Sequence, residues 1–457
     1  KLAKKYKITQ QEEKDIQKSK MEVPLLSASS LPKYSERVCA PISSGSPGMA
    51  ALFLVTTATG AGFLVMPYTM SNCGITAGLL MLAYSMWLAY ENIVTSGLCF
   101  SRLDLSHFSD IVYEVGGRSL QKLVLAFMAL TGCMNILLHN VLITELAANF
   151  FQMVGLVDHQ LNYTDPLSGF RVSAMIVLAL LQFIIFIRTP SPDKMKMFSF
   201  LSLVCVIYLT LVLLFELPTY LQEYWDWNQL KLGIDFSATT TRDIGVYQFS
   251  FFISGNVMIS IYNLNNPTEQ KVTKIAFGSN LFLGCLYSLT AVVGYISTLQ
   301  HTPTVVLTRP TLPGLSIWPM QVARCGLMIT LLTANITSYA SVRSSVTQFT
   351  LLAKKEVETK GVDKNASSLL QDAITTAALA TAGVFLSQVI TTISFVGSLA
   401  GVVVFSLPMI VVLRTKHMRI SKQKRLELVL LILVNMYIGS YNFVYNCLVY
   451  LGIMEEQ

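Results

Sequence analysis

A segment near residue 60 places helix-weakening and hydroxyl-bearing residues inside an apolar stretch. It reads VTTATGAGFLVMPYTMSNCG over residues 55–74, with Pro67 beyond its two glycines. Gly60 and Gly62 favour an interrupted helix, and the backbone N–H groups that such a break frees bind an anion such as a carboxylate. The carbonyls that it frees, together with hydroxyl oxygens, suit a hard monovalent cation. The hydroxyls before the break belong to Thr56, Thr57 and Thr59.

A second segment has the same character. Residues 245–271 read GVYQFSFFISGNVMISIYNLNNPTEQK, with Ser254, Gly255 and Asn256 at the centre of the apolar part and Pro267 beyond its end. Two interrupted membrane helices in corresponding halves of a chain indicate a binding site near the middle of the bilayer. Close packing of helices at their glycines is the alternative interpretation, and it is weaker when both breaks carry polar residues.

The composition shows which elements must position these segments. The 457 residues are 53% hydrophobic and only 13% charged, and the mean hydropathy is +0.55. Apolar segments of about 20 residues, long enough to cross a bilayer as helices, recur along the chain. We expect an all-α polytopic membrane protein with eleven transmembrane helices, the first and sixth of them broken. The predicted spans are 48–72, 75–101, 119–151, 171–188, 195–218, 244–264, 275–298, 319–341, 367–388, 391–413 and 426–449.

The distribution of positive charge gives the orientation. With a cytoplasmic N-terminus, the segments on the inner side carry 28 of the 33 Lys and Arg residues. This asymmetry is the positive-inside pattern, and it places the C-terminus on the opposite side. A mitochondrial matrix would satisfy the rule as well, so neither a plasma nor an organelle membrane is selected. The net charge of +7 follows from topology, and we expect no nucleic-acid partner.

The chain divides into a tail and a membrane domain. Residues 1–47 are polar, basic and rich in Ser and Pro towards their end, which predicts a largely disordered cytoplasmic tail. Residues 48–457 form the membrane domain, with a first five-helix repeat at about 48–218 and a second at about 244–413. The helix predicted at 426–449 is additional to both repeats.

Few titratable groups lie within the predicted spans. Glu91 lies deep in the second span, where a carboxylate is a candidate for carrying a proton. A structural hydrogen bond to a neighbouring helix is the alternative for Glu91. His139 and Glu145, in the third span, are interpreted as packing or interfacial groups. Asn162 begins an Asn-Tyr-Thr sequon in a predicted outer loop and is a glycosylation candidate.

Enzyme chemistry is not predicted. The eight cysteines avoid the long outer loops, which argues against a disulfide or a cysteine-based metal site there. The sequence contains no phosphate-binding loop, no His-Glu-x-x-His motif and no nucleophile elbow. We expect no metal site and no cofactor other than a coupling ion.

Four motifs resemble those of the amino acid/auxin permease family, which includes sodium-coupled neutral, vesicular and proton-coupled amino acid transporters. They are ATGAGFLVMPYTMSNCGI in the first span, SDIVYEVGGRSLQKLV before the third, SGNVMISIYNLNNPTEQKVTKIA in and after the sixth, and SYASVRSSVTQF at the end of the eighth. The similarity covers nearly all of residues 48–449. It implies a LeuT-type fold, with an inverted repeat of five plus five helices and one extra, and secondary active transport of amino acids.

The resemblance also implies site residues. The backbone N–H groups near Gly60 would bind the α-carboxylate, and carbonyls at Phe252 and Ser254 the α-ammonium. The implied substrate site comprises Thr57, Gly60, Ala61, Gly62, Asn135, Phe252, Ser254, Gly255, Asn256 and Ser406. The implied ion site comprises Thr56, Thr59, Thr333 and Thr337. The bound species would be a small amino acid, with a neutral one favoured because neither break carries a charged side chain.

Departures from the family pattern leave alternatives open. Sodium-coupled members have Asn where Thr56 stands, and prolines where Ile336 and Ser341 stand in this chain. Either Na⁺ or H⁺ is therefore expected as the coupling ion, with Glu91 as the candidate in the proton case. The same departures keep a second function open, namely a non-transporting amino-acid sensor or a structural subunit of a membrane complex. Oligomeric state is not predicted.

Overall fold

The computed structural model describes residues 45–103, 108–153, 168–187, 192–234, 238–252, 254–265, 267–353, 366–385, 389–415 and 420–450. Within these ranges the chain is helical and contains no strand. Almost all of the predicted tail, and the glycosylation candidate Asn162, lie outside the described residues.

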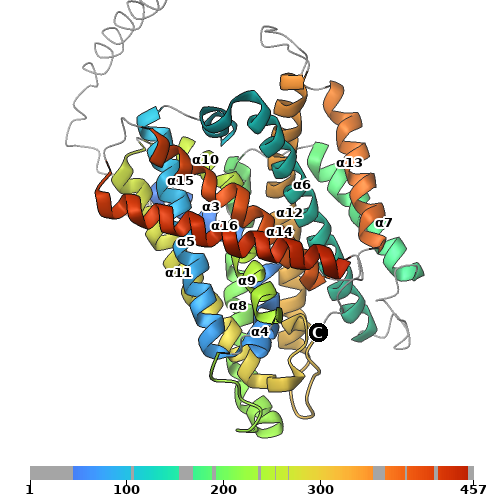
Figure 1. The fold of residues 1–457 in the computed structure, drawn as a ribbon. Helices are drawn as coiled ribbons and strands as arrows, with labels where there is room; N and C mark the ends of the chain where they lie inside the picture. The colour runs from blue at the N-terminus through green and yellow to red at the C-terminus, as the bar shows by residue number, and fades with distance from the viewer. Residues whose placement is uncertain are drawn as a thin grey trace, which may run out of the picture. The chain divides into compact units, whose positions relative to one another are not determined.

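Each predicted span coincides with one helix or with consecutive helices (Figure 1). The α-helices are α3 (Pro47–Ala58), α4 (Gly62–Cys73), α5 (Ile75–Leu103), α6 (Phe108–Met153), α7 (Gly169–Ile187), α8 (Pro192–Tyr224), α9 (Ala238–Ser250), α10 (Ser254–Tyr262), α11 (Glu269–Thr298), α12 (Trp318–Ala353), α13 (Ala366–Phe385), α14 (Val389–Ala400), α15 (Ser406–Arg414) and α16 (Lys422–Tyr450). Short 3₁₀ turns lie at Leu299–His301 and Val306–Thr308, and a π-helical turn at Gly401–Phe405 joins α14 to α15.

Six of the described helical segments are long and apolar enough to cross a membrane, and the bent pair α3–α4 adds a seventh. The six are Phe108–Met153, Phe198–Tyr224, Glu269–His301, Trp318–Thr350, Val389–Arg414 and Lys422–Val449. Two shorter apolar helices are Gly169–Ile185 and Asp372–Phe385. These segments identify an integral membrane protein.

Local sequence signals set several helix ends. Ser46 caps α3 by accepting a hydrogen bond from the backbone N–H of Met49 at 3.2 Å, and Pro47 occupies the first turn, where no backbone donor is needed. In α6 the pair Gly116–Gly117 is not helical, and Gly117 has φ 67°. The kink separates a short leading segment from the long part of α6, which matches the span predicted at 119–151.

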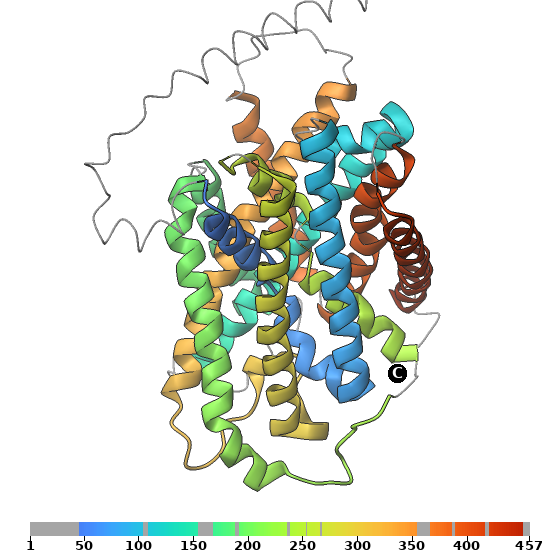
Figure 2. The same cartoon turned by 90° about the vertical axis from the view of Figure 1, so that its left-hand side faces the viewer.

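Helices five positions apart in the predicted order pack against each other. The first broken helix contacts the sixth, with α4 against α9 and α3 against α10. The second and seventh helices, α5 and α11, are also in contact, as are α6 with α12 and α7 with α13. In the 90° view of Figure 2, α5, α8 and α11 are seen along their length. This pairing brings the two interrupted helices together at the centre of the packing.

The last helix runs in a different direction from its neighbours. Figure 1 shows α16 lying across α5, and Figure 2 shows α16 nearly end-on. It packs against α14, α15 and α9. Asn435 of α16 donates to the carbonyl of Gly401 at 2.5 Å, and Asn92 of α5 donates to the carbonyls of Val404 and Phe405, both at 3.2 Å. Side-chain amides therefore satisfy carbonyls of the π-helical turn, as buried backbone groups require.

Candidate functional site

The first helix is broken where the two glycines predicted it. α3 and α4 are bent by 58° across Thr59, Gly60 and Ala61. The N–H of Gly60 donates to the carbonyl of Ala58 at 2.8 Å, which closes a tight turn between the two halves. No side chain caps the start of α4, so its first N–H groups point out of the helix with its positive dipole end. This end of α4 suits an anion.

The sixth helix is broken in the corresponding place. α9 ends at Ser250 and α10 begins at Ser254. Between them, Phe251 and Phe252 make only short-range turn hydrogen bonds to the carbonyls of Gln248 and Phe249, at 3.2 and 3.0 Å. The backbone of the predicted residues Ser254, Gly255 and Asn256 forms the first turn of α10.

The two breaks touch each other. A Cβ atom built on Gly62 would lie 2.1 Å from Oγ and 3.0 Å from Cα of Ser250. Only a residue without a side chain fits between α4 and α9 at this point. Gly62 therefore sets the separation of the two broken helices.

A tyrosine that the sequence analysis did not select joins the two breaks. The hydroxyl of Tyr287, on α11, lies 2.9 Å from the carbonyl of Ala58 and 3.4 Å from that of Ser250, which are the last residues of α3 and α9. Its ring stacks on Phe63 and contacts Phe251 edge-on. A buried Tyr in an apolar helix is ordinarily a packing residue, so no sequence signal distinguished it.

Replacing Tyr287 with Phe removes the hydroxyl and keeps the ring. It should therefore weaken the site without a large change in packing volume. The two carbonyls lose their donor, which costs about 1–3 kcal/mol for a buried group left unpaired. We expect ligand binding at the two breaks to weaken by about 5- to 150-fold, with the protein still folded. Tyr208→Phe is the matched control, because the Tyr208 hydroxyl bonds the carbonyl of Pro319 at 3.3 Å, on α12. Equal losses in both variants would contradict the role assigned to Tyr287.

A histidine also faces the first break. The side chain of His139, on α6, is 1% exposed, and a Cβ on Gly60 would lie 2.9 Å from its Nε2 atom. Its Nδ1 atom lies 2.8 Å from Oδ1 of Asn335 on α12. Asn335 in turn donates to Oδ1 of Asn140 at 2.9 Å. The interpretation of His139 as a packing or interfacial group therefore missed its position beside the break.

The hydroxyls predicted to hold an ion all donate to carbonyls of their own helices. Thr56 bonds the carbonyls of Leu52 and Phe53 at 3.0 and 3.1 Å, and Thr59 bonds that of Thr56 at 3.0 Å. Thr333 bonds the carbonyl of Ile329 and Thr337 that of Ala334 in the same way. Thr57, which was predicted in the substrate site, likewise bonds the carbonyl of Phe53. Their oxygen lone pairs are not used in these bonds, so the ion site stays a prediction.

Three further predicted residues are engaged with other helices. Asn135 donates to the hydroxyl of Ser338 on α12 at 2.7 Å. Ser406 accepts from Asn435 of α16 at 3.0 Å. Phe252 contacts the ring of Phe405 edge-on, with the centroids 6.3 Å apart.

Glu91 has a basic partner that the sequence analysis did not find. Its side chain is 1% exposed, and Oε1 lies 2.5 Å from Nζ of Lys424, at the start of α16. Lys424 also pairs with Glu427 at 3.2 Å. This ion pair attaches α16 to the middle of α5, which favours the structural alternative for Glu91 over proton carriage.

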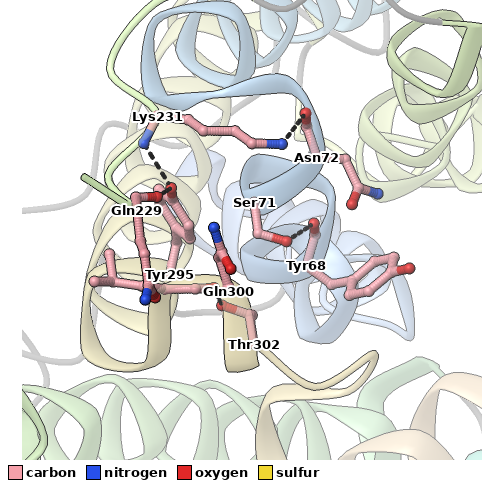
Figure 3. Close-up of a pocket in the computed structure, with 9 residues that line it drawn as sticks. Tyr68, Ser71, Asn72, Gln229, Lys231, Tyr295, Gln300 and Thr302 are labelled. Carbon is pink, nitrogen blue, oxygen red and sulfur yellow. Dashed lines mark hydrogen bonds between the residues drawn. The ribbon is translucent and has the colours of Figure 1, made fainter. Parts of the chain in front are cut away.

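A cavity of about 280 Å³ lies beside the second half of α4 (Figure 3). It lies on the part of α4 that is remote from the break and is lined by polar groups from α4, from the segment after α8 and from the end of α11. Lys231 donates its backbone N–H to the hydroxyl of Tyr295 at 2.9 Å and its ammonium to the carbonyl of Asn72 at 3.5 Å. The cavity provides a concrete alternative position for a ligand.

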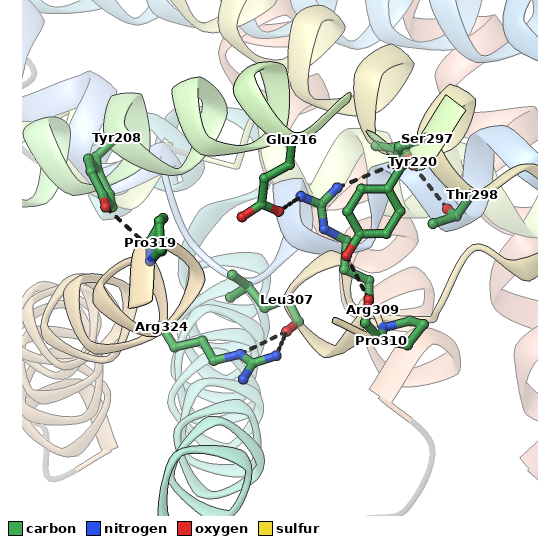
Figure 4. A network of polar contacts seen from close by, with 11 residues as sticks. Tyr208, Glu216, Tyr220, Ser297, Thr298, Leu307, Arg309, Pro310, Pro319 and Arg324 are labelled. Carbon is green, nitrogen blue, oxygen red and sulfur yellow. Dashed lines mark hydrogen bonds and ion pairs between the residues drawn. The ribbon is translucent and has the colours of Figure 1, made fainter. Parts of the chain in front are cut away.

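The segment between α11 and α12 is held by buried charges (Figure 4). Arg309 forms an ion pair with Glu216 of α8, and its guanidinium lies 4.1 Å from the ring centroid of Tyr220. Arg324 of α12 donates twice to the carbonyl of Leu307, at 2.9 and 2.7 Å. Both arginines are 2% exposed, so they fix this segment over α8 and α12.

Comparison with known proteins agrees with this architecture. A manganese transporter of Eremococcus coleocola, solved with an aromatic bis-isothiourea compound, superposes with a TM-score of 0.53. The alignment is 10% identical in sequence and covers 94% of this chain and 92% of that one. The chain thus has the fold of a membrane transporter. The family described as transmembrane amino acid transporter protein matches residues 43–451, and the chain belongs to this family.

Two curated relatives match a shorter part of the chain. A putative amino acid transporter AAT1 of Toxoplasma gondii is 26% identical over 278 residues, which are 58% of this chain and 35% of the relative. Solute carrier family 38 member 10 of Mus musculus is 22% identical over 274 residues, 56% of this chain and 23% of the relative. The similarity therefore spans less than half the length of these relatives.

Proposed function

We propose that the protein is a secondary active transporter of amino acids, driven by a cation gradient. The observation that supports this most is the contact between the two helix breaks, where the uncapped start of α4 meets the end of α9 across Gly62. An α-carboxylate is stabilised by free N–H groups at a helix start, and an α-ammonium by the carbonyls at a helix end. An amino-acid zwitterion carries both of the charges that these two helix ends would stabilise, and the family membership supports an amino acid as that zwitterion.

The transport cycle is proposed to be alternating access around the two breaks. Support comes from the contacts between helices five positions apart, which an inverted repeat of five plus five helices would produce. In this proposal all eleven helical segments cross the bilayer, with the N-terminus on the inner side and the C-terminus on the outer side. One repeat rocks against the other and exposes the bound amino acid to each side in turn.

Uptake into proteoliposomes tests the function. The purified protein is given a mixture of labelled amino acids under an inward proton gradient or an inward sodium gradient. Accumulation above the external concentration under either gradient is the expected result, and the effective gradient identifies the coupling ion. If neither gradient drives flux while the protein binds amino acids and is folded, the sensor or structural function replaces the proposal.

A further inference from the structure

His139 places an unpaired nitrogen at the first helix break. The ring is 1% exposed, and its Nε2 atom has no hydrogen-bond partner among the described residues. That atom lies 2.9 Å from the position that a Cβ atom on Gly60 would take, and Gly60 is two residues before the uncapped start of α4. A buried polar atom without a partner is rare in folded proteins, and at a helix start it indicates a site for a ligand.

A chain of side-chain amides determines which nitrogen of the ring carries hydrogen. Oδ1 of Asn140 accepts from Nδ2 of Asn335 at 2.9 Å and from Nε2 of Gln182, on α7, at 2.5 Å. Because the Asn335 amide nitrogen is used there, its Oδ1 atom faces Nδ1 of His139 and can only accept. With the three amides in these orientations, Nδ1 bears the hydrogen. In the neutral ring, Nε2 then presents a lone pair to the break.

A lone pair repels a carboxylate, whereas a protonated Nε2 donates a charge-assisted hydrogen bond to it. We propose that His139 takes up one proton on Nε2 and binds the α-carboxylate of the substrate through it, so that one proton binds with each amino acid. This rests on the proposed function and assigns its coupling ion and one of its substrate contacts. The proton comes from water on the side of entry and is released to water on the side of exit.

The surroundings of His139 suit this role because they are neutral. It faces Asn335 from α12 and Gly60 from the break, and Asn335 is the side chain that hydrogen-bonds its ring. The titratable groups on neighbouring elements have other partners. Among them are Glu145 of α6, attracted to Arg171; Tyr287 of α11, hydrogen-bonded to the carbonyl of Ala58; Asp243 of α9, 3.7 Å from Arg242; Glu91 of α5, paired with Lys424; and, on α12, Tyr339 with Asp372, Arg343 with Asp372 and Arg324 with the carbonyl of Leu307. Among the described residues no carboxylate pairs with the His139 ring, so a substrate carboxylate would supply the counter-ion of an imidazolium here.

Two substitutions of His139 distinguish the role of its Nδ1 atom from the role of its Nε2 atom. His139→Asn can keep an N–H donor for Asn335 but leaves nothing at the position of Nε2. His139→Gln puts an amide N–H near that position at every pH. Ser338→Ala is the matched control, because it removes the hydrogen bond from Asn135 between the same two helices without touching the break. Glu91→Gln tests the other candidate for the coupling group.

The measurement is calorimetric titration in sodium-free buffers of different ionisation enthalpy, which gives the number of protons taken up per amino acid bound. The twenty L-amino acids are first screened by thermal stabilisation, and the strongest binder is the probe. At pH values where His139 is neutral before binding, we expect nearly one proton to be taken up per amino acid bound. This holds for the wild type, Ser338→Ala and Glu91→Gln. Over that pH range the Kd should rise about tenfold per pH unit. His139→Gln should bind without proton uptake and with a flat pH profile, and His139→Asn should bind at least tenfold more weakly.

A change in the ligand provides a test that needs no variant. The amino alcohol of the probe replaces the carboxylate with a hydroxymethyl group, and its binding to the wild type should take up no proton. Wild-type binding of the amino acid without proton uptake, or undiminished uptake in His139→Asn, would overturn this inference and leave the proposed function standing. If no amino acid binds the wild type and none is transported, the proposed function fails and this inference fails with it.

Discussion

We expect Gly62→Leu to abolish the proposed transport, lowering uptake by about 100-fold or more, because the two helix breaks can no longer meet. Even the first atom of a side chain at Gly62 would lie 2.1 Å from Oγ of Ser250 and 3.0 Å from its Cα atom. The Oγ atom belongs to a side chain, but the Cα atom of Ser250 is backbone and cannot move aside as a flexible side chain would. In the proposed site, the groups that would bind the two ends of the substrate would then be held at the wrong separation. Initial rates of labelled amino-acid uptake in proteoliposomes measure the effect.

Two further variants test whether the loss of uptake comes from the contact between Gly62 and Ser250. Gly278→Leu, on α11, is the matched control, because a Cβ there meets no atom within 4 Å, and uptake should stay near the wild-type rate. Gly62→Ala combined with Ser250→Gly removes the colliding Oγ and Cβ atoms and should recover part of the uptake lost in Gly62→Ala alone. Normal uptake by Gly62→Leu would show that the substrate does not bind between the breaks.

Arg309→Met is expected to cause the largest loss of stability, about 3–5 kcal/mol. It leaves the carboxylate of Glu216 buried, at 8% exposure, without its cation. It also removes the contact with the ring of Tyr220 and the hydrogen bond to Ser297 at 3.4 Å. The thermal unfolding midpoint of the protein in detergent is the measurement, and Arg309→Met should give the lowest value among the charge variants.

An exposed ion pair supplies the contrast. Arg102 and Glu269 are paired at 2.5 Å with 35% and 41% of their side chains exposed, and such pairs contribute about 0–1 kcal/mol. Arg102→Met should therefore leave the midpoint almost unchanged. The double variant with Arg309→Met and Glu216→Leu should recover much of the loss, because no unpaired charge then remains buried. If the double variant is as unstable as Arg309→Met, the loss comes from packing and not from the carboxylate.

The helices could be predicted from the sequence because the length and hydropathy of an apolar segment are enough to indicate a membrane helix. The first break was predictable for a related reason, since Gly60 and Gly62 interrupt a segment that is otherwise apolar. The break of the sixth helix followed from the same pattern at Ser254 and Gly255, and the structure begins α10 at that place. These signals are local, so a single sequence carries them.

Partners from distant parts of the chain could not be predicted. Glu91 looked like an isolated carboxylate, yet its basic partner Lys424 lies 333 residues further on. The direction of the His139 ring depends on Asn335, 196 residues away, and no periodicity within α6 reveals it. Tyr287 bridges both breaks because α11 packs beside them, a tertiary arrangement that hydropathy does not encode. The sequence thus predicted where the helices are interrupted. It did not predict which side chains from other helices lie beside these breaks.

The most direct test of the account is a structure of the protein in lipid nanodiscs with its best-transported amino acid bound. We predict density for the ligand between the two breaks, with the carboxylate within about 3.2 Å of the backbone N–H groups of Ala61 and Gly62 and of Nε2 of His139. Density in the cavity beside Tyr68 and Lys231, with the region between the breaks filled by protein side chains, would contradict the assignment of the site.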